Sequence, residues 1–558
     1  MANIEDHFRK LYARYGVGQD MPVQVQQIAE LFDCSIRNAR ITLTRMQQEN
    51  WIEWQPQRGR GKQSILRLLI APDTLINQNI EQMIAHFDYG NVLKFIGNEK
   101  QALNRIIQYR FGAQENNSET RVRIPYYRDI DRLNPLHPLR RTERHLVRQC
   151  LSGLTRYDGV QGKIVPDIAH YWTHNEQATR WEFYIKSTAH FSDGERLSAP
   201  LLARCLNAAS QSPWFAALFS DLSAIYAADE YQLVVETSVS MNRLDCLLAT
   251  QAALIFDLRD SEMRCSGPFR IQRHQGNFLT LHRNEHYHQA RPMLNEINIF
   301  TWAPESISTS FIPVLHGEQA LDTRPLSERQ LEKGSCFVLV DNEGLFADDV
   351  GRRFLNHVLQ PMALLDRTNL PQEYASILSI AQGLLPEWNH RRVDFGNIPL
   401  PFTAHRQVSI ATFGQPELIE LAQAMADILR GHHFQCTVHV YTFEEFTMGN
   451  TQSADVWLTN FMLDTLSSPA FLDWLASSPV FRHLPEKAQQ DHRALIQHIL
   501  NEADDVAHQS INEHFHQLTH QRWIIPLLHH WMEFANENSF TWRDLSTLGW
   551  PDFSQLWL

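Results

Sequence analysis

Residues 25–68 read VQQIAELFDCSIRNARITLTRMQQENWIEWQPQRGRGKQSILRL, and this stretch decides the fold of the N-terminal part of the chain. Apolar residues recur there at helical spacing in two short segments, with Val25, Ile28, Ala29 and Phe32 inward in the first and Ile36, Ala39, Leu43 and Met46 inward in the second. Asp33 and Cys34 form the turn, and Ser35 is a favourable N-cap for a second helix that ends near Gln48. Residues 51–54 and 64–68 flank a glycine-rich tip, which predicts a β-hairpin. This order of elements predicts a winged helix-turn-helix.

The second helix and the hairpin tip carry residue types that contact DNA. Arginine and asparagine can make paired hydrogen bonds to base edges in the major groove, and a recognition helix uses its N-terminal residues for such contacts. A basic tip on glycine-separated backbone could reach phosphates or a minor groove. The candidate DNA-binding residues are Ser35, Arg37, Asn38, Thr42, Arg45, Arg58, Arg60 and Lys62. Alternatively, these residues form a solvated basic surface, but their order and spacing favour DNA binding.

Charge is unevenly distributed along the chain, which has 558 residues and a formal net charge of −13. Residues 1–115 hold 14 Lys and Arg against 12 Asp and Glu, whereas the remainder holds 36 against 51. Nucleic acid would therefore be attracted by the N-terminal segment and repelled by the rest. The length suggests about three or four domains of ordinary size.

The cysteines and the N-terminus predict a soluble protein of the cytoplasm. The seven cysteines are scattered without any CxxC spacing, which is typical of a reduced intracellular chain. The first residues lack the basic and apolar regions of a signal peptide. No apolar run approaches the ~20 residues that a membrane-spanning helix needs. We therefore expect no membrane partner.

After the hairpin, the sequence patterns divide the chain into three segments of different predicted structure. Residues 74–111 are expected to be mostly helical, either packed against the winged helix or forming a dimer seam. Residues 113–120 are polar and predict a linker. From residue 121 onward strand and helix patterns alternate, which predicts an α/β architecture. The clearest strands are expected at 121–127, 181–185, 232–236, 337–340, 407–410 and 437–440, and the clearest helices at 142–151, 199–209 and 416–429.

Short motifs follow one another in a fixed order along nearly the whole chain. They are Leu31–Ser35, Trp51–Trp54, Gly59–Lys62, Leu133–Leu136, Leu151–Thr155, Pro166–Trp172, Trp181–Phe183, Phe191–Gly194, Ser266–Phe269 with Arg283, Asn284 and Tyr287, Gly383–Pro386, Pro526–Trp531 and Thr547–Trp550. The ordered set resembles the SgrR family of transcriptional regulators, in which a winged helix is fused to a solute-binding domain of the oligopeptide-binding, family 5 kind. The resemblance implies a winged helix-turn-helix domain with connecting helices at 1–112 and a two-lobed, periplasmic-binding-protein-like (type II) domain at 121–558.

The resemblance also implies how the two parts work. The lobes of such a domain close on a ligand at a hinge, and closure could report ligand occupancy to the winged helix. The best-known family member responds to sugar-phosphate stress by activating a small RNA. Peptide-binding relatives carry an Asp-Tyr-x-x-Pro-like segment whose aspartate holds the terminal amine of the peptide. The nearest segment here, Asp464–Pro469, is one residue longer and lacks the tyrosine, so we expect a ligand other than a peptide.

Residues that could contact such a ligand fall into two classes. An anionic ligand favours arginines near a helix start, and Arg140 and Arg141 directly precede the expected helix at 142–151. Trp388, Trp457, Trp474 and Trp531 could line an apolar cleft wall. Asp464 is a further candidate, because it begins the segment that corresponds to the amine-binding motif of the peptide-binding relatives. The alternatives are a solvated basic turn for the arginines and core packing for the tryptophans.

Catalytic and metal sites are not expected. Adjacent histidines, such as His432–His433 and His529–His530, point to opposite faces of a strand and do not converge on a metal. The sequence has no GxSxG or SxxK frame, and the tip at 58–62 lacks the GxxxxGK[ST] frame of a phosphate-binding loop. We therefore expect neither an enzyme nor a cofactor.

Together these features predict a cytoplasmic, ligand-responsive transcription factor. Its expected partners are double-stranded DNA and a small molecule, for which a sugar phosphate or related metabolite is a candidate. RNA polymerase and a second copy of the chain are further candidate partners. The alternative hypothesis is a cytosolic solute-binding or sequestering protein whose N-terminal domain makes only protein contacts.

Overall fold

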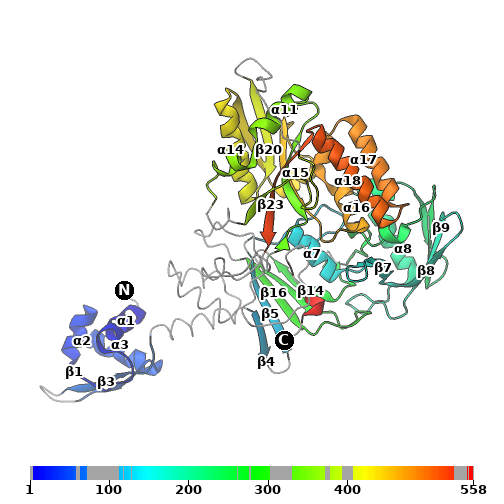
Figure 1. Ribbon diagram of the computed structural model, residues 1–558. Coiled ribbons are helices and arrows are strands. Elements are labelled where there is room, and N and C mark those ends of the chain that lie inside the picture. The colour runs from blue at the N-terminus through cyan, green and yellow to red at the C-terminus, as the bar shows by residue number, and fades with distance from the viewer. Residues whose placement is uncertain are drawn as a thin grey trace. The chain divides into compact units, whose positions relative to one another are not determined.

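The computed structural model describes residues 4–57, 63–71, 112–116, 119–126, 128–259, 262–275, 278–301, 330–370, 377–391, 406–532, 550 and 552–556 (Figure 1). The chain divides into two compact units, Met1–Arg110 and Phe111–Leu558. The predicted helical segment at 74–111 and the basic tip at 58–62 lie outside the described residues.

The N-terminal unit has the predicted order of helices and hairpin. Its elements are α1 (Ile4–Tyr15), β1 (Met21–Val23), α2 (Val25–Phe32), α3 (Ile36–Gln48), β2 (Ile52–Gln55) and β3 (Ser64–Leu68). The strands form a three-stranded sheet in the order β1-β3-β2, with β3 antiparallel to both neighbours. The burial pattern of β3 alternates strictly, so that Ser64, Leu66 and Leu68 face inward. Ile28, Phe32, Ala39, Leu43 and Met46 of the two central helices complete this core.

A five-stranded sheet opens the C-terminal unit. Its order is β14-β15-β16-β5-β4, from Phe269–Gln275, Phe278–Arg283, Glu296–Thr301, Glu119–Tyr126 and Gly112–Asn116. Only the β16–β5 pair in it is parallel. Helix α7 (Arg141–Cys150) packs on this sheet together with the C-terminal residues Trp550 and Phe553. Trp550 donates its indole N–H to the Thr142 hydroxyl at 3.1 Å, which ties the end of the chain to the start of α7.

The predicted linker at 113–120 is therefore wrong. Gly112–Asn116 forms β4 and pairs antiparallel with β5, in the register Gly112↔Arg123 to Asn116↔Glu119. β4 is an edge strand, held on one side by main-chain hydrogen bonds, and such a strand can be polar throughout. Its composition is for that reason hard to distinguish from that of a linker.

A four-stranded antiparallel sheet follows in the chain. It has the order β10-β11-β9-β8, from Leu222–Ala227, Gln232–Thr237, Arg180–Ile185 and Ala169–His174. Helix α8 (Ala199–Ser210) packs on β10 and β11. The smaller elements around it are β6 (Thr155–Asp158), β7 (Lys163–Pro166), α9 (Ala216–Phe219), α10 (Leu244–Leu247), η1 (Gln251–Ala253), β12 (Asp257–Arg259) and β13 (Glu262–Arg264). We refer to residues 112–301 with 550–556 as the first lobe.

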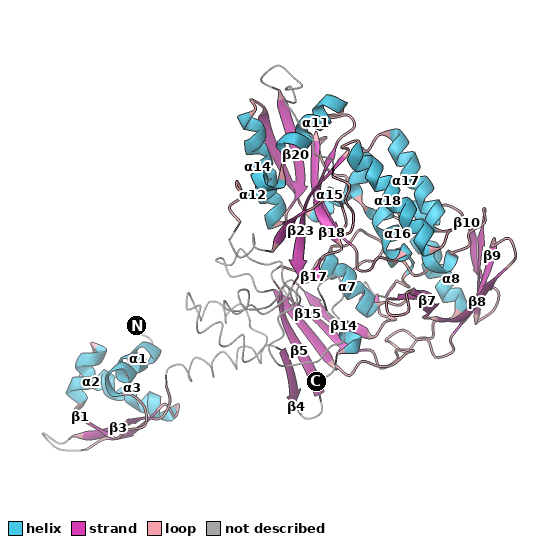
Figure 2. Ribbon diagram, in the orientation of Figure 1, coloured by secondary structure: helices cyan, strands magenta, loops and turns pink. Residues whose placement is uncertain are grey.

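The second lobe, residues 330–532, is built on a seven-stranded sheet (Figure 2). The order is β17-β23-β18-β22-β20-β21, from Gln330–Leu331, Ile524–Met532, Gly334–Val340, Val456–Met462, Gln407–Phe413 and Gln435–Tyr441, and β19 (Leu378–Ile380) pairs with β23. The helices of this lobe are α11 (Asp349–Val358), α12 (Pro361–Leu365), α14 (Pro416–Gly431), α15 (Phe443–Met448), α16 (Ser468–Ser477), η3 (Pro479–His483), α17 (Glu486–Ile499) and α18 (Asp504–His520). The short helix η4 (Phe553–Gln555) belongs to the first lobe. Helix α14 packs on β20 and β21, and α18 packs on β23.

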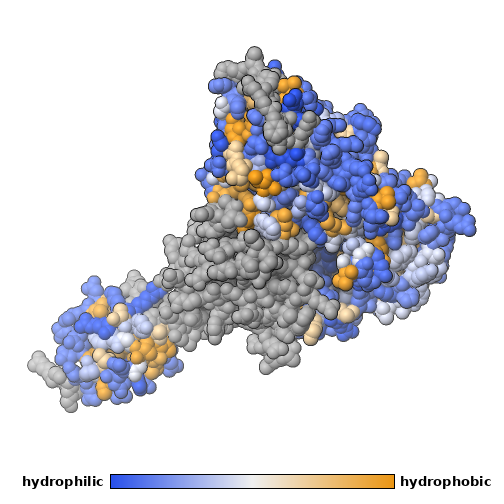
Figure 3. Space-filling view, viewed as in Figure 1, coloured by the Kyte–Doolittle hydropathy of each residue, from blue (hydrophilic) through white to orange (hydrophobic). Residues whose placement is uncertain are grey.

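The predicted α/β class is confirmed. Each of the six strands and three helices expected from the sequence occurs within a few residues of its predicted bounds. The largest apolar core joins residues of the four-stranded and seven-stranded sheets, whereas the five-stranded sheet has a core of its own with α7. Figure 3 shows that the visible face of the described second lobe is mostly hydrophilic, with hydrophobic residues in small groups. Most hydrophobic side chains of the described C-terminal unit thus pack in its interior.

Candidate functional site

The turn between α2 and α3 fixes how the second helix is presented. Asp33 adopts a left-handed backbone conformation, with φ of 53°, and its N–H donates to the Glu30 carbonyl. Aspartate tolerates this conformation better than most residues. Ser35 then caps α3, because its hydroxyl oxygen accepts the backbone N–H of Asn38 at 3.2 Å. The cap satisfies one of the N–H groups that the first turn leaves without a helical partner.

The outward face of α3 is basic, with an apolar centre. Arg37, Asn38, Arg40 and Arg45 are exposed, and Thr42 is half-buried. Ile41 is 57% exposed between the arginines. Of the candidate DNA-binding residues, the five on or next to α3 therefore lie on one described element, whereas Arg58, Arg60 and Lys62 are outside the described residues.

The prediction that Ile36 faces the core is wrong. Its side chain is 44% exposed, although Ala39, Leu43 and Met46 are buried as expected. Ile36 is the first residue of α3, so no preceding helical turn covers it. The helical periodicity places it near the edge of the buried face, where the end of the helix decides its exposure.

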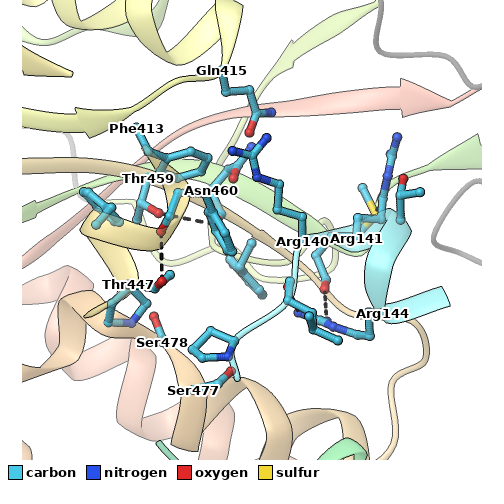
Figure 4. Close-up of a pocket in the computed structure, with 18 of the residues that line it drawn as sticks. Arg140, Arg141, Arg144, Phe413, Gln415, Thr447, Thr459, Asn460, Ser477 and Ser478 are labelled. Carbon is cyan, nitrogen blue, oxygen red and sulfur yellow. Dashed lines mark hydrogen bonds between the residues drawn. The ribbon is translucent and has the colours of Figure 1, made fainter. Parts of the chain in front are cut away.

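A cavity of about 130 Å³ lies between the two lobes of the C-terminal unit (Figure 4). On the side of the first lobe it is lined by the start of α7 and by Tyr126 and Arg128. On the side of the second lobe the lining comes from the ends of β20 and β22, from α15 and from the end of α16. The two lobes thus meet here through polar, cationic and aromatic side chains, including Phe413, Phe443 and Trp474.

Arg140 and Arg141 both line this cavity. Arg140 is the N-cap residue of α7 and Arg141 is its first residue. The Arg140 guanidinium lies 4.9 Å from the ring centre of Phe443 and 5.9 Å from that of Phe413, both in the second lobe. Figure 4 shows Arg140 extending toward Phe413 and Gln415. Its Nε also lies 3.4 Å from a carboxylate oxygen of Asp131. The side chain therefore bridges the lobes through a cation–π contact and carries an ion pair on its own side.

Three more arginines surround the start of α7. Arg128 makes two hydrogen bonds, of 2.6 and 2.8 Å, to the buried carboxylate of Glu143. Burial acts to raise the pKa of Glu143, but Arg128 lowers it overall. Arg144 donates to the carbonyl of Met462 in the second lobe at 2.9 Å. Arg148 pairs with Asp464 at 3.2 Å and with Asp473 at 3.1 Å.

The charges in this region do not cancel. The lining contains four arginines, at 128, 140, 141 and 144, and one carboxylate, Glu332, while Glu143 and Asp131 pair with Arg128 and Arg140. The first turn of a helix adds backbone N–H groups and the positive end of the helix dipole. The lining of the cavity is therefore suited to a small anion.

Glu332 and His530 form a polar pair on the opposite wall. His530 Nδ1 lies 2.6 Å from Oε1 of Glu332, and both side chains are buried. Burial acts to lower the pKa of His530, but the Glu332 carboxylate raises it overall. Next to this pair, burial raises the pKa of Glu417 to about 7. The pair therefore lies beside a carboxyl group, Glu417, that changes charge near neutral pH.

Most of the other candidate ligand residues lie elsewhere. Trp457 is buried in the core, where its indole N–H donates to Asp341 at 2.9 Å, and Trp388 stacks on His390 beside a separate shallow depression. Trp531 pairs in β23 with Leu331. Asp464 forms an ion pair with Arg148 at 3.2 Å. The structure thus brings Arg140, Arg141 and Trp474 together in the cavity, whereas Trp388, Trp457, Trp531 and Asp464 do not line it.

Sequence reasoning missed several residues that line the cavity. Arg144 could have been found, since it lies one helical turn after Arg140 and Arg141. Glu332 and His530 carry no local signal, because 198 positions separate them in the sequence. Within the described ranges, the structure contains no group of three His, Cys, Asp or Glu side chains that could hold a metal ion. Among the described helices none is both long and apolar enough to cross a membrane.

Two family models match the chain. Residues 3–118 match the N-terminal domain of sugar transport-related sRNA regulators, and residues 163–310 match the middle part of bacterial extracellular solute-binding proteins of family 5. A protein of Yersinia enterocolitica named HTH-type transcriptional regulator SgrR is 28% identical, over all of this chain and 98% of its own length. A protein of the same name from Salmonella choleraesuis is 26% identical over 97% of this chain and 96% of the relative.

Solved structures show the same fold for the C-terminal unit. The periplasmic binding protein DppA from Helicobacter pylori, solved with the peptide STSA, has a TM-score of 0.60 at 11% identity and covers 79% of this chain and 99% of its own. The Escherichia coli murein tripeptide binding protein MppA has a TM-score of 0.57 at 13% identity, over 79% of this chain and 98% of its own. Relatives named SgrR therefore match the whole length of the chain, and the SgrR N-terminal model and the family 5 solute-binding model match it in that order.

Proposed function

We propose that the chain is a cytoplasmic, DNA-binding regulator of transcription, in which the N-terminal unit contacts duplex DNA and the C-terminal unit senses a small anionic ligand. The outward face of α3 carries this proposal, because a capped helix after a tight turn presents three exposed arginines. Those residue types read base edges and phosphates. The names of the relatives, which are transcriptional regulators, support the same function.

The proposed DNA contacts are divided between two elements. Ser35, Arg37 and Asn38 at the start of α3 would meet base edges in the major groove, followed by Thr42 and Arg45. Arg58, Arg60 and Lys62 of the hairpin tip would contact phosphates or an adjacent minor groove. The net positive charge of residues 1–115 supports an approach of DNA to this part of an otherwise acidic chain.

A binding experiment on the full chain tests the DNA half. Affinity for duplexes selected from a random library is measured at several salt concentrations, for the wild type and for the double variant Arg37→Ala, Arg45→Ala. We expect the affinity of the wild type to fall steeply with salt, because phosphate contacts release counterions. The double variant should bind about 30-fold or more weakly, at ~1–3 kcal/mol for each paired base contact. Arg9→Ala, Lys10→Ala, at exposed positions of α1, is the matched control. Equal binding by both double variants would exclude α3 as the recognition helix.

The cavity supports the ligand half of the proposal. Its excess positive charge and the start of α7 favour a compact anion, and a phosphate monoester such as a sugar phosphate has the charge and the acceptor oxygens for them. The Asp464–Pro469 segment departs from the pattern of the peptide-binding relatives, which disfavours a peptide. We propose that Arg140 and Arg141 contact the anion, and that the protein has no catalytic activity.

Thermal unfolding of the full chain tests the ligand half. Inorganic phosphate, a set of sugar phosphates and the matching free sugars are compared, because a ligand that binds only the folded state raises the melting temperature. We expect phosphorylated compounds to stabilise the wild type, and Arg140→Ala and Arg141→Ala to lose most of this shift. Arg204→Ala, 67% exposed on α8, controls for the loss of one arginine. A larger shift with the free sugars would contradict an anion site.

Coupling between the two halves has a thermodynamic consequence. If the ligand changes DNA affinity by some factor, DNA must change ligand affinity by the same factor. Measuring both affinities with one ligand and one duplex therefore tests whether the C-terminal unit acts as a sensor. Contacts with RNA polymerase and with a second copy of the chain belong to the same proposal, and analytical ultracentrifugation with and without DNA tests the latter.

A further inference from the structure

The centre of the outward face of α3 is apolar, which the general role of a DNA-binding helix does not require. Ile41 is 57% exposed and Ile36 is 44% exposed. Single exposed isoleucines are common on protein surfaces. Ile41, however, lies on the face that carries Arg37 and Arg45 and stands between them in the sequence, whereas Ile36 lies near the edge of the buried face.

The spacing of these residues places them in one row. Arg37, Ile41 and Arg45 are four residues apart, and such positions are neighbours along a helix surface. From the first to the last, the helix rises by about 12 Å, at ~1.5 Å per residue. That is roughly the rise of three to four base pairs at ~3.4 Å each. Two arginines can therefore reach base pairs on either side of the one that faces Ile41.

The neighbouring hydroxyl is already used inside the helix. Thr44 Oγ1 donates to the carbonyl of Arg40 at 2.9 Å. This bond removes the one proton that the threonine could give to a base edge. Thr44 therefore offers no proton beside Ile41, whereas guanidinium groups lie one helical turn before and one turn after it. Such a face matches a groove with an apolar group at its centre and acceptors on both sides.

We propose that Ile41 is a specificity-determining residue that reads the methyl group of thymine in the major groove. This inference rests on the proposed DNA binding. The methyl group is the apolar feature that distinguishes thymine in this groove, while guanine offers the acceptors that arginine prefers. The operator should therefore hold an A·T pair opposite Ile41, flanked by guanines within two base pairs.

A protein partner is the competing occupant of this face. An isoleucine in a protein interface would be covered by apolar residues, and exposed arginines at both ends would need acidic partners. DNA supplies the negative charge and the methyl group together, which is why we favour it. The test below separates the two occupants, because the 5-methyl group of thymine can be removed without changing any other group of the duplex.

The experiment uses the full chain and duplexes selected from a random library. Each selected duplex is prepared with thymine and with deoxyuridine, and affinities are measured for the wild type, Ile41→Ala and Ile41→Val. We expect the wild type to lose about fourfold in affinity when the contacted methyl is removed, which corresponds to ~0.8 kcal/mol for one buried methyl group. Ile41→Ala should bind both duplexes equally and as weakly as the wild type binds the deoxyuridine form. Ile41→Val should keep most of the discrimination. Val17→Ala, at an exposed apolar position outside α3, should behave as the wild type.

The contrary outcomes are distinguishable. If the wild type binds the selected duplexes with no difference between thymine and deoxyuridine, or if Ile41→Ala discriminates as well as the wild type, the inference is wrong and the DNA-binding function stands. If the full chain selects no duplex at all, both fall together. Selected sites without a common A·T pair would likewise overturn the role of Ile41.

Discussion

His530 Nδ1 lies 2.6 Å from Oε1 of Glu332, and the same oxygen accepts the backbone N–H of His530 at 3.0 Å. Both side chains are buried and line the cavity between the lobes. Because Glu332 raises the pKa of His530 against the effect of burial, the pair favours the imidazolium form. This wall of the cavity therefore holds an ion pair whose net charge depends on pH. The nearby Glu417 also raises the pKa of His530.

Glu417→Gln should change the pH dependence of stability. Burial raises the pKa of Glu417 from 4.5 to about 7. The folded state therefore holds this proton more tightly than the unfolded chain, so its contribution is fully present below about pH 4.5 and is lost as pH rises through 7. The glutamine cannot ionise, so we expect the variant to exceed the wild type in urea-unfolding free energy at pH 8, by roughly 3 kcal/mol, and to match it at pH 4.5. Glu444→Gln, exposed on α15, is the control for the lost charge. A difference that is the same at both pH values would contradict the assignment.

Arg148→Met should be most destabilising at alkaline pH. Burial raises the pKa of Asp473 to about 6, and Arg148 is the strongest influence that lowers it. Without the arginine, a buried carboxylate loses its partner, which costs about 3–5 kcal/mol when it is ionised. At pH 5 Asp473 can take up a proton instead, so the loss should be smaller there than at pH 8. Lys487→Met removes a surface pair with Asp491 and should cost at most ~0.5 kcal/mol at either pH. Melting curves at the two pH values decide the outcome.

Local sequence patterns predicted the helices and strands well because each depends on neighbouring residues. The Ser35 cap and the apolar spacing of residues 39, 43 and 46 defined α3, and Arg140 was placed correctly at the start of α7. The cavity could be predicted only in part. Its second wall brings Glu332, Phe413 and His530 together from strands far apart in the chain, and strand order is not encoded in any local pattern. Of the four candidate tryptophans, Trp474 lines the cavity and the other three do not, because an indole ring packs as well in a protein core as against a ligand.

Gly334→Ala should disturb the cavity through the backbone. A Cβ atom at Gly334 would lie 2.0 Å from the carbonyl oxygen of Phe461 and 2.7 Å from Cα of Met462. These are backbone atoms of the paired strand β22, and both residues line the cavity. We expect a loss of about 1–3 kcal/mol in the free energy of unfolding, as for other overpacked sites. Gly431→Ala meets no atom within 4 Å at the end of α14 and should be neutral or slightly stabilising. Similar melting temperatures for the two variants would show that β18 and β22 can separate without cost.

Substitutions of Ser35 should separate its capping role from DNA contact. Ser35→Ala removes the acceptor for the Asn38 N–H and should cost about 1 kcal/mol, seen as faster amide exchange along α3. Ser35→Asp and Ser35→Asn both retain a cap acceptor, so both should keep the exchange protection of the wild type. They differ by one negative charge at the start of the helix. This charge interacts favourably with the helix dipole but repels the phosphates of DNA. We therefore expect Ser35→Asp to bind selected duplexes more weakly than Ser35→Asn, with a gap that narrows at high salt because exposed charges are screened. Equal affinities for the two capped variants would place the start of α3 away from the DNA backbone.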